Sequence, residues 1–95
     1  MEEDELIYEC VRALQPDAYA TAIMLYIERW YALSFPLAVI SLSLERMTSL
    51  GILTKYYRDR PWWGRVQPIA HYRIAGPFVP AASVALPDAQ LQEAV

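Results

Sequence analysis

The stretch that decides the fold runs from Ser34 to Tyr57 and reads SFPLAVISLSLERMTSLGILTKYY. Its first half carries apolar residues at helical spacing, namely Leu37, Ile40, Leu44 and Met47. After Gly51 the pattern changes, and the β-branched and aromatic residues of Ile52–Tyr57 are typical of a strand. Because proline is tolerated in the first turn of a helix and glycine often ends one, Ser34, Pro36 and Gly51 predict a helix with defined ends, followed directly by a strand.

Two more helices are expected on the N-terminal side of this stretch. Apolar residues recur at i, i+3, i+4 and i+7 within Leu6–Leu14, which predicts an amphipathic helix that ends at Pro16. Asp17 is a suitable N-cap for a second helix, whose apolar residues keep helical spacing as far as Trp30. The sequence therefore predicts a short turn, Tyr31 to Ser34, between the second and third helices.

On the C-terminal side, Ile69–Ile74 has the composition of a second strand. The segment between the strands, Arg60–Pro68, contains two prolines and a glycine, which predicts a long hairpin loop. Three helices followed by a two-stranded β-hairpin predict an α+β fold, the winged helix-turn-helix, over residues 1–76. Residues 77–95 contain three prolines and are expected to form an extended arm with one short helix from residue 88.

The composition fits one domain and argues against a membrane protein. The chain has 95 residues, of which 56% are hydrophobic and 20% charged, so it can form a core and is expected to oligomerise. The charge-free stretch Trp30–Leu44 contains three serines and a proline and is shorter than the ~18–20 apolar residues of a spanning helix. The acidic start, Met1–Glu5, differs from the basic start of a secretion signal, and we expect a cytoplasmic protein.

Charge is unevenly distributed along the chain, although the net charge is only −3. Residues 1–45 contain eight acidic and two basic side chains, whereas residues 46–76 contain six basic side chains and Asp59 alone as an acid. A basic segment within an acidic protein is the pattern expected when one face binds an anionic polymer such as nucleic acid. The same segment is equally consistent with a basic, solvated surface.

A helix that reads the major groove needs cations against phosphates and a few polar side chains toward the base edges. The candidate DNA-binding residues, on the third helix and around the wing, are Ser34, Ser41, Ser43, Arg46, Lys55, Arg58, Arg60 and Arg65. The leading turns of that helix are unusually apolar, with Phe35, Leu37, Val39 and Leu42. Double-stranded DNA is therefore the first predicted partner, and a protein bound through the apolar helix face and the wing is the alternative.

Two adjacent tryptophans, Trp62 and Trp63, stand in the predicted loop. Exposed tryptophans often mark an interface or a ligand contact. Trp30 is a further candidate wall for a planar aromatic ligand. The alternative is a wing that folds back, so that the two rings cover the sheet or a partner subunit.

The sequence contains no pattern that predicts catalysis or a cofactor. His71 is the only histidine and lies among apolar strand residues, and the single Cys10 can form neither an internal disulfide nor a cysteine-rich zinc site. No glycine-rich phosphate loop, paired histidine ligands or nucleophile motif is present. We therefore expect a binding protein that is not an enzyme and uses no metal.

Three segments resemble one known family. Leu37–Leu53 resembles the recognition helix of PadR-like winged-helix regulators and its entry into the wing, His71–Gly76 resembles their closing strand, and Ala18–Ala20 stands where the family has a Tyr-Gly pair. The resemblance implies a bacterial or phage-type transcriptional repressor that binds palindromic DNA as a homodimer, with its third helix in the major groove.

The chain departs from this family pattern at three places. Ser41 stands where a tyrosine that contacts a DNA phosphate is usual, and Ala38 stands where glycine is common. Trp62 and Trp63 replace a basic run in the wing. These departures favour the alternative, which is a winged helix that binds protein instead of DNA.

Overall fold

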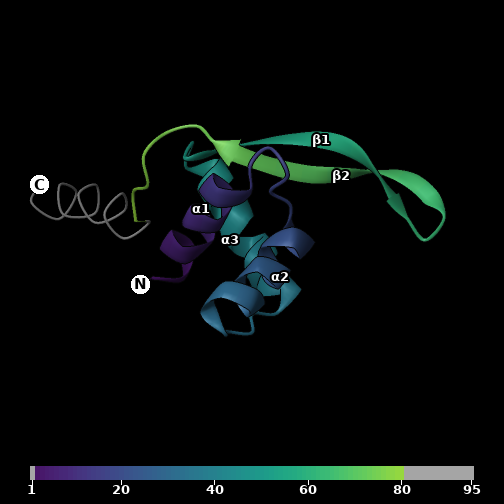
Figure 1. Ribbon diagram of the computed structural model, residues 1–95. Coiled ribbons are helices and arrows are strands. Elements are labelled where there is room, and N and C mark those ends of the chain that lie inside the picture. The colour runs from purple at the N-terminus through teal and green to yellow at the C-terminus, as the bar shows by residue number, and fades with distance from the viewer. Residues whose placement is uncertain (1, 81–95) are drawn as a thin grey trace, which may run out of the picture.

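The computed structural model describes residues 2–80 and contains three helices followed by one hairpin (Figure 1). The elements are α1 (Glu3–Leu14), α2 (Ala20–Tyr31), α3 (Leu37–Ser49), β1 (Leu53–Trp62) and β2 (Arg65–Ile74). This order confirms the predicted α+β winged-helix arrangement. The predicted helix from residue 88 lies outside the described residues.

The three helices enclose one apolar core. Its fully buried side chains come from one face of each helix and are Ile7, Val11, Ile23, Ile27, Ile40, Leu44 and Met47. Cys10 is also buried among them, and this burial raises the pKa of its thiol to about 11, so the thiol stays protonated. None of the helices in the described part of the chain is long and apolar enough to cross a membrane.

The helix ends follow the predicted signals with one exception. α3 begins directly after Pro36, and the chain leaves it at Gly51, whose φ of 78° is a left-handed conformation that suits glycine. The exception is Asp17. The N-cap of α2 is Tyr19 without a side-chain cap, and Asp17 instead accepts hydrogen bonds from two arginines of the hairpin.

The hairpin also differs from the prediction, because the expected long loop Arg60–Pro68 is wrong. β1 and β2 are paired without interruption from Leu53–Ile74 to Trp62–Arg65, and only Trp63 and Gly64 form the turn. Both turn residues have positive φ, 53° and 75°, as a two-residue type I′ turn requires. The hairpin is therefore long and narrow, and it extends well past the helices (Figure 1).

The two prolines fit the strands because of their register. In an antiparallel pair, hydrogen-bonded and non-hydrogen-bonded positions alternate, and Trp62 opposite Arg65 closes the turn as a hydrogen-bonded pair. Pro61 and Pro68 then both fall in non-hydrogen-bonded pairs, where the missing N–H would have pointed away from the partner strand. Composition alone does not reveal this register.

The base of the hairpin is tied to the helices through the connection between α1 and α2. The Tyr72 N–H donates to the Ala18 carbonyl at 2.8 Å, and the Ile74 N–H donates to the Gln15 side chain at 3.0 Å. Buried residues occur only in the inner half of the hairpin, which we define as Leu53–Tyr56 with His71–Ile74. The outer half, residues 57–70, contains no buried residue.

Candidate nucleic-acid interface

α3 presents two unlike faces. Its inner face carries the buried Ile40, Leu44 and Met47, whereas Leu42 on the outer face is 66% exposed and Leu37 is also exposed. Ser34 lies exposed in the turn before α3, and Ser41 is half-buried on the helix. The exposed residues in the leading turns of α3, Leu37, Ala38 and Leu42, are thus apolar.

Ser43 and Arg46 lie where α3 meets α1, bound to one buried carboxylate. Asp4 accepts a hydrogen bond from the Ser43 hydroxyl at 2.7 Å and two from the Arg46 guanidinium, one of them from Nε at 2.8 Å. The hydrogen bond from Arg46 is the main reason that the pKa of Asp4 is lowered. Ser43 is fully buried, so it belongs to the core, and Arg46 joins two helices.

Most cations of the hairpin are matched by acids from the helices or their connections. Lys55 pairs with Glu45 at 3.1 Å, and Asp17 pairs with both Arg58 at 3.0 Å and Arg60 at 2.7 Å. Within residues 2–80, which the structure describes, the Arg65 side chain has neither an ion pair nor a hydrogen bond. Arg73 likewise has no ion pair or side-chain hydrogen bond there and meets only the Tyr56 ring, so Arg65 and Arg73 are the hairpin cations most directly available to an anionic partner.

Arg60 is held more firmly than its neighbours. Its Nε donates to Nε2 of the buried His71 at 2.8 Å, and its guanidinium lies 4.4 Å from the centre of the Tyr19 ring. Because Nε2 accepts, Nδ1 of His71 carries the proton and donates to the Ile69 carbonyl at 2.8 Å. His71 thus has both ring nitrogens occupied within the fold.

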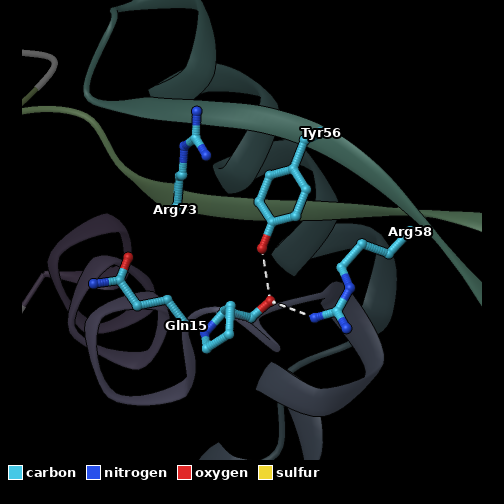
Figure 2. A pocket seen from close by; sticks show the side chains of 5 residues that line it. Gln15, Tyr56, Arg58 and Arg73 are labelled. Carbon is cyan, nitrogen blue, oxygen red and sulfur yellow. Dashed lines mark hydrogen bonds between the residues drawn. The ribbon is translucent and has the colours of Figure 1, made fainter.

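An open cavity of about 510 Å³ lies between the hairpin and the connection between α1 and α2. Figure 2 shows Arg73 and Arg58 on either side of Tyr56, with Gln15 on the opposite wall. The Tyr56 hydroxyl donates to the Pro16 carbonyl at 2.6 Å, and Arg58 donates to the same oxygen at 3.4 Å. Arg73 lies 5.5 Å from the Tyr56 ring centre, so this wall is cationic.

A second, more enclosed hollow of about 280 Å³ lies between the hairpin and the starts of α2 and α3. Its apolar walls are Leu37, Pro61, Trp62 and Ile69, and Arg60 and Thr21 supply polar atoms. Trp62, which is 45% exposed, is therefore a half-buried wall of this hollow.

The three tryptophans do not form one site. Trp63 is 89% exposed at the turn, which means that the wing does not fold back over the sheet. Trp30 is 63% exposed on α2, contacts Tyr26 and Arg29, and lines neither hollow. The structure therefore brings Trp62 near α3 and leaves Trp63 in solvent.

The comparisons with known proteins support the fold. No protein-family model and no curated protein sequence matches this chain. The solved structure of Pex from Synechococcus sp. (strain PCC 7942) is similar over all of this chain and 84% of Pex, with a TM-score of 0.58 and 16% sequence identity. The shared feature is the fold. Membership of the PadR-like family stays a prediction from the sequence motifs.

The sequence did not identify three acids that contact the predicted site residues. Asp4, Asp17 and Glu45 together bind four of the six cations in the basic segment. The uneven charge showed that the N-terminal half holds most acids, but not which cation each acid would meet. No cluster of His, Cys, Asp and Glu that could hold a metal occurs among the described residues.

Proposed function

We propose that this winged helix binds double-stranded DNA and regulates transcription, as a binding protein rather than an enzyme. The observation that carries the proposal is the charge of the long hairpin beside α3. Its strands hold Lys55, Arg58, Arg60, Arg65 and Arg73 against Asp59 alone, a charge of +4 on a protein whose net charge is −3. Such a local field attracts a polyanion in spite of the overall acidity.

The ion pairs of the hairpin are compatible with this role because their acids are exposed. The side chains of Asp17 and Glu45 are 59% and 50% exposed, and such surface pairs contribute only ~0–1 kcal/mol. Phosphate groups can replace these carboxylates at little cost, so Lys55 and Arg58 remain proposed phosphate contacts, together with Arg65, which has no acid to release among the described residues. Arg60 is a weaker candidate because it is also bound to His71.

α3 would then read the major groove mainly through small and apolar side chains. Ala38 and Leu42 are exposed and suit contacts with thymine methyl groups, and the hydroxyls of Ser34 and Ser41 suit phosphates or base edges. Ser43 and Arg46 are left out of this proposed surface because Asp4 binds both. A homodimer would place two such helices on a palindromic site. Binding to operator DNA would also make this a cytoplasmic protein.

Fluorescence anisotropy with a random-sequence duplex at several salt concentrations tests the proposal. Wild type is expected to bind at low salt and to weaken steeply as salt rises. Arg58→Ala with Arg65→Ala should weaken binding and lower the slope of log affinity against log salt by up to ~2, because each lost phosphate contact removes about 0.9.

Arg12→Ala with Arg29→Ala is the matched control. It removes the same two positive charges from α1 and α2, so it separates a contact at the hairpin from an effect of net charge. We expect the control to keep the wild-type slope. Equal slopes for the two double variants would contradict the assignment of the hairpin, and absence of wild-type binding at low salt would overturn the DNA proposal.

The second candidate function is a protein-binding winged helix. It is favoured by a specific observation, the exposed apolar surface formed by Leu37 and Leu42 on α3 together with Trp62 on the hairpin. This candidate becomes the better one if wild type does not bind duplex DNA at low salt.

A further inference from the structure

The tip of the hairpin carries a residue that the fold itself does not favour. Trp63 occupies the first position of the type I′ turn with φ of 53°, and Gly64 follows with φ of 75°. Asn-Gly or Asp-Gly is the usual pair in such turns, and a bulky residue with positive φ costs about 1 kcal/mol or more. Neither turn geometry nor core packing therefore explains a tryptophan here.

Exposure of the indole to water is a second cost of placing tryptophan at this position. Trp63 is 89% exposed, and its ring has no aromatic or cation–π partner within the described residues. Val66, next to the turn, is 69% exposed, so the tip is an apolar end on a charged arm. Arg65, which follows the turn directly, lies beside this end without a partner in the described part of the chain.

We propose that Trp63 acts as an apolar wedge that enters the minor groove of duplex DNA and partly unstacks one base step. The proposal rests on the proposed function and adds the kind of contact that the wing makes. Minor-groove proteins use apolar side chains as wedges in this way, and flexible pyrimidine–purine steps unstack most readily. Arg65, which follows the turn, would contact a phosphate at the edge of that groove.

The shape and charge of the hairpin favour DNA as the binding partner of its tip. The outer half of β1, residues 57–62, spans roughly 20 Å and has no buried residue, so the tip can reach a neighbouring minor groove while α3 stays in the major groove. The outer half, residues 57–70, carries Arg58, Arg60 and Arg65 against Asp59 alone, a charge of +2. Only the projecting indole has to enter the minor groove, which is about 6 Å wide, whereas the two-stranded arm stays outside it.

The test uses Trp63→Asn, which creates the Asn-Gly pair that type I′ turns prefer and removes the indole. The midpoint of thermal unfolding should stay the same or rise, so loss of binding cannot be attributed to misfolding. The affinity for a duplex with a central TpA step should fall roughly tenfold, as for the loss of one aromatic–base contact. The salt slope should stay at the wild-type value, because no cation is lost.

Unstacking is measured directly by the permanganate reactivity of the thymine in that TpA step. Wild type should raise this reactivity, Trp63→Asn should abolish the increase, and Trp63→Phe should retain most of it. Arg65→Ala should lower the salt slope but keep the reactivity. Leu25→Ala, which shortens an exposed apolar side chain on α2, is the control and should bind as wild type does.

The outcomes separate the two proposals. If wild type and Trp63→Asn bind with equal affinity and equal permanganate reactivity, the wedge is overturned and the proposed function stands. If Trp63→Asn and Leu25→Ala lose affinity equally, the effect is not specific to the tip and the wedge is likewise overturned. If wild type does not bind the duplex even at low salt, the proposed function fails and the wedge fails with it.

Discussion

The two halves of the hairpin have the same backbone geometry but different surroundings. The inner half packs against α1 and α3 and carries the buried Leu53, His71 and Tyr72. The outer half has no buried residue, and it ends in the exposed Trp63. The inner half therefore determines most of the stability, whereas the outer-half residues other than Arg60, which is bound to His71, are free to serve binding.

The comparison also separates two kinds of polar contact. In the inner half, His71 is fully buried and both ring nitrogens are hydrogen-bonded. In the outer half, Arg58 meets an exposed acid, and Arg65 has no partner among the residues that the structure describes. Substitutions should therefore change unfolding in one half and binding in the other.

The largest effect is expected for a matched pair of tyrosines. Tyr72→Ala in the inner half removes a buried ring and should lower the free energy of unfolding by ~3–5 kcal/mol. Tyr57→Ala, which removes an exposed ring at the start of the outer half, should change it by less than ~0.5 kcal/mol. Urea unfolding of both variants measures the difference, and equal losses would contradict the division of the hairpin.

A smaller effect is expected from the hydrogen bond between His71 and Arg60. His71→Leu keeps an apolar group in the core but leaves the Arg60 Nε and the Ile69 carbonyl without their partner, which should cost ~1–3 kcal/mol. Combining it with Arg60→Met gives a double-mutant cycle. We expect the two losses to be non-additive; strict additivity would show that the contact contributes nothing.

The fold could be predicted from the sequence because it depends on local patterns. Helical spacing and the change of period at Gly51 are properties of neighbouring residues, and both are confirmed. The long loop was wrong because Pro61 and Pro68 are compatible with a strand only in one register, which is set by the turn at Trp63 and Gly64. Register is a property of the pair of strands, and composition does not contain it.

The candidate site could be predicted only in part, for a related reason. The basic residues are visible in the sequence, but their acids are 42 residues away for Arg46 and 41 for Arg58. Only the packed fold brings Asp4 to Arg46 and Asp17 to Arg58. The sequence therefore identified which side chains are charged, and the structure was needed to show which of them are already bound.

The smallest effect is a pH dependence at Glu45, where α3 meets the inner half. The Glu45 carboxylate accepts from the Tyr72 hydroxyl at 2.6 Å and pairs with Lys55 at 3.1 Å. The hydrogen bond from Tyr72, followed by that from Lys55, lowers the pKa of Glu45. Because the folded protein binds this proton less readily than the unfolded chain, the stabilisation is present above the usual pKa of glutamate and is lost as pH falls through the lowered value.

Unfolding of wild type and Glu45→Gln, measured from neutral to acidic pH, tests this prediction. Wild type should be more stable at neutral pH by less than ~1 kcal/mol, since the carboxylate is half exposed, and the difference should shrink toward zero in acid. Asp59→Asn in the outer half is the control, because Asp59 is exposed and has no ion pair within residues 2–80. A difference for Glu45→Gln that stays constant with pH would mean that this carboxylate does not hold α3 to the hairpin through its charge.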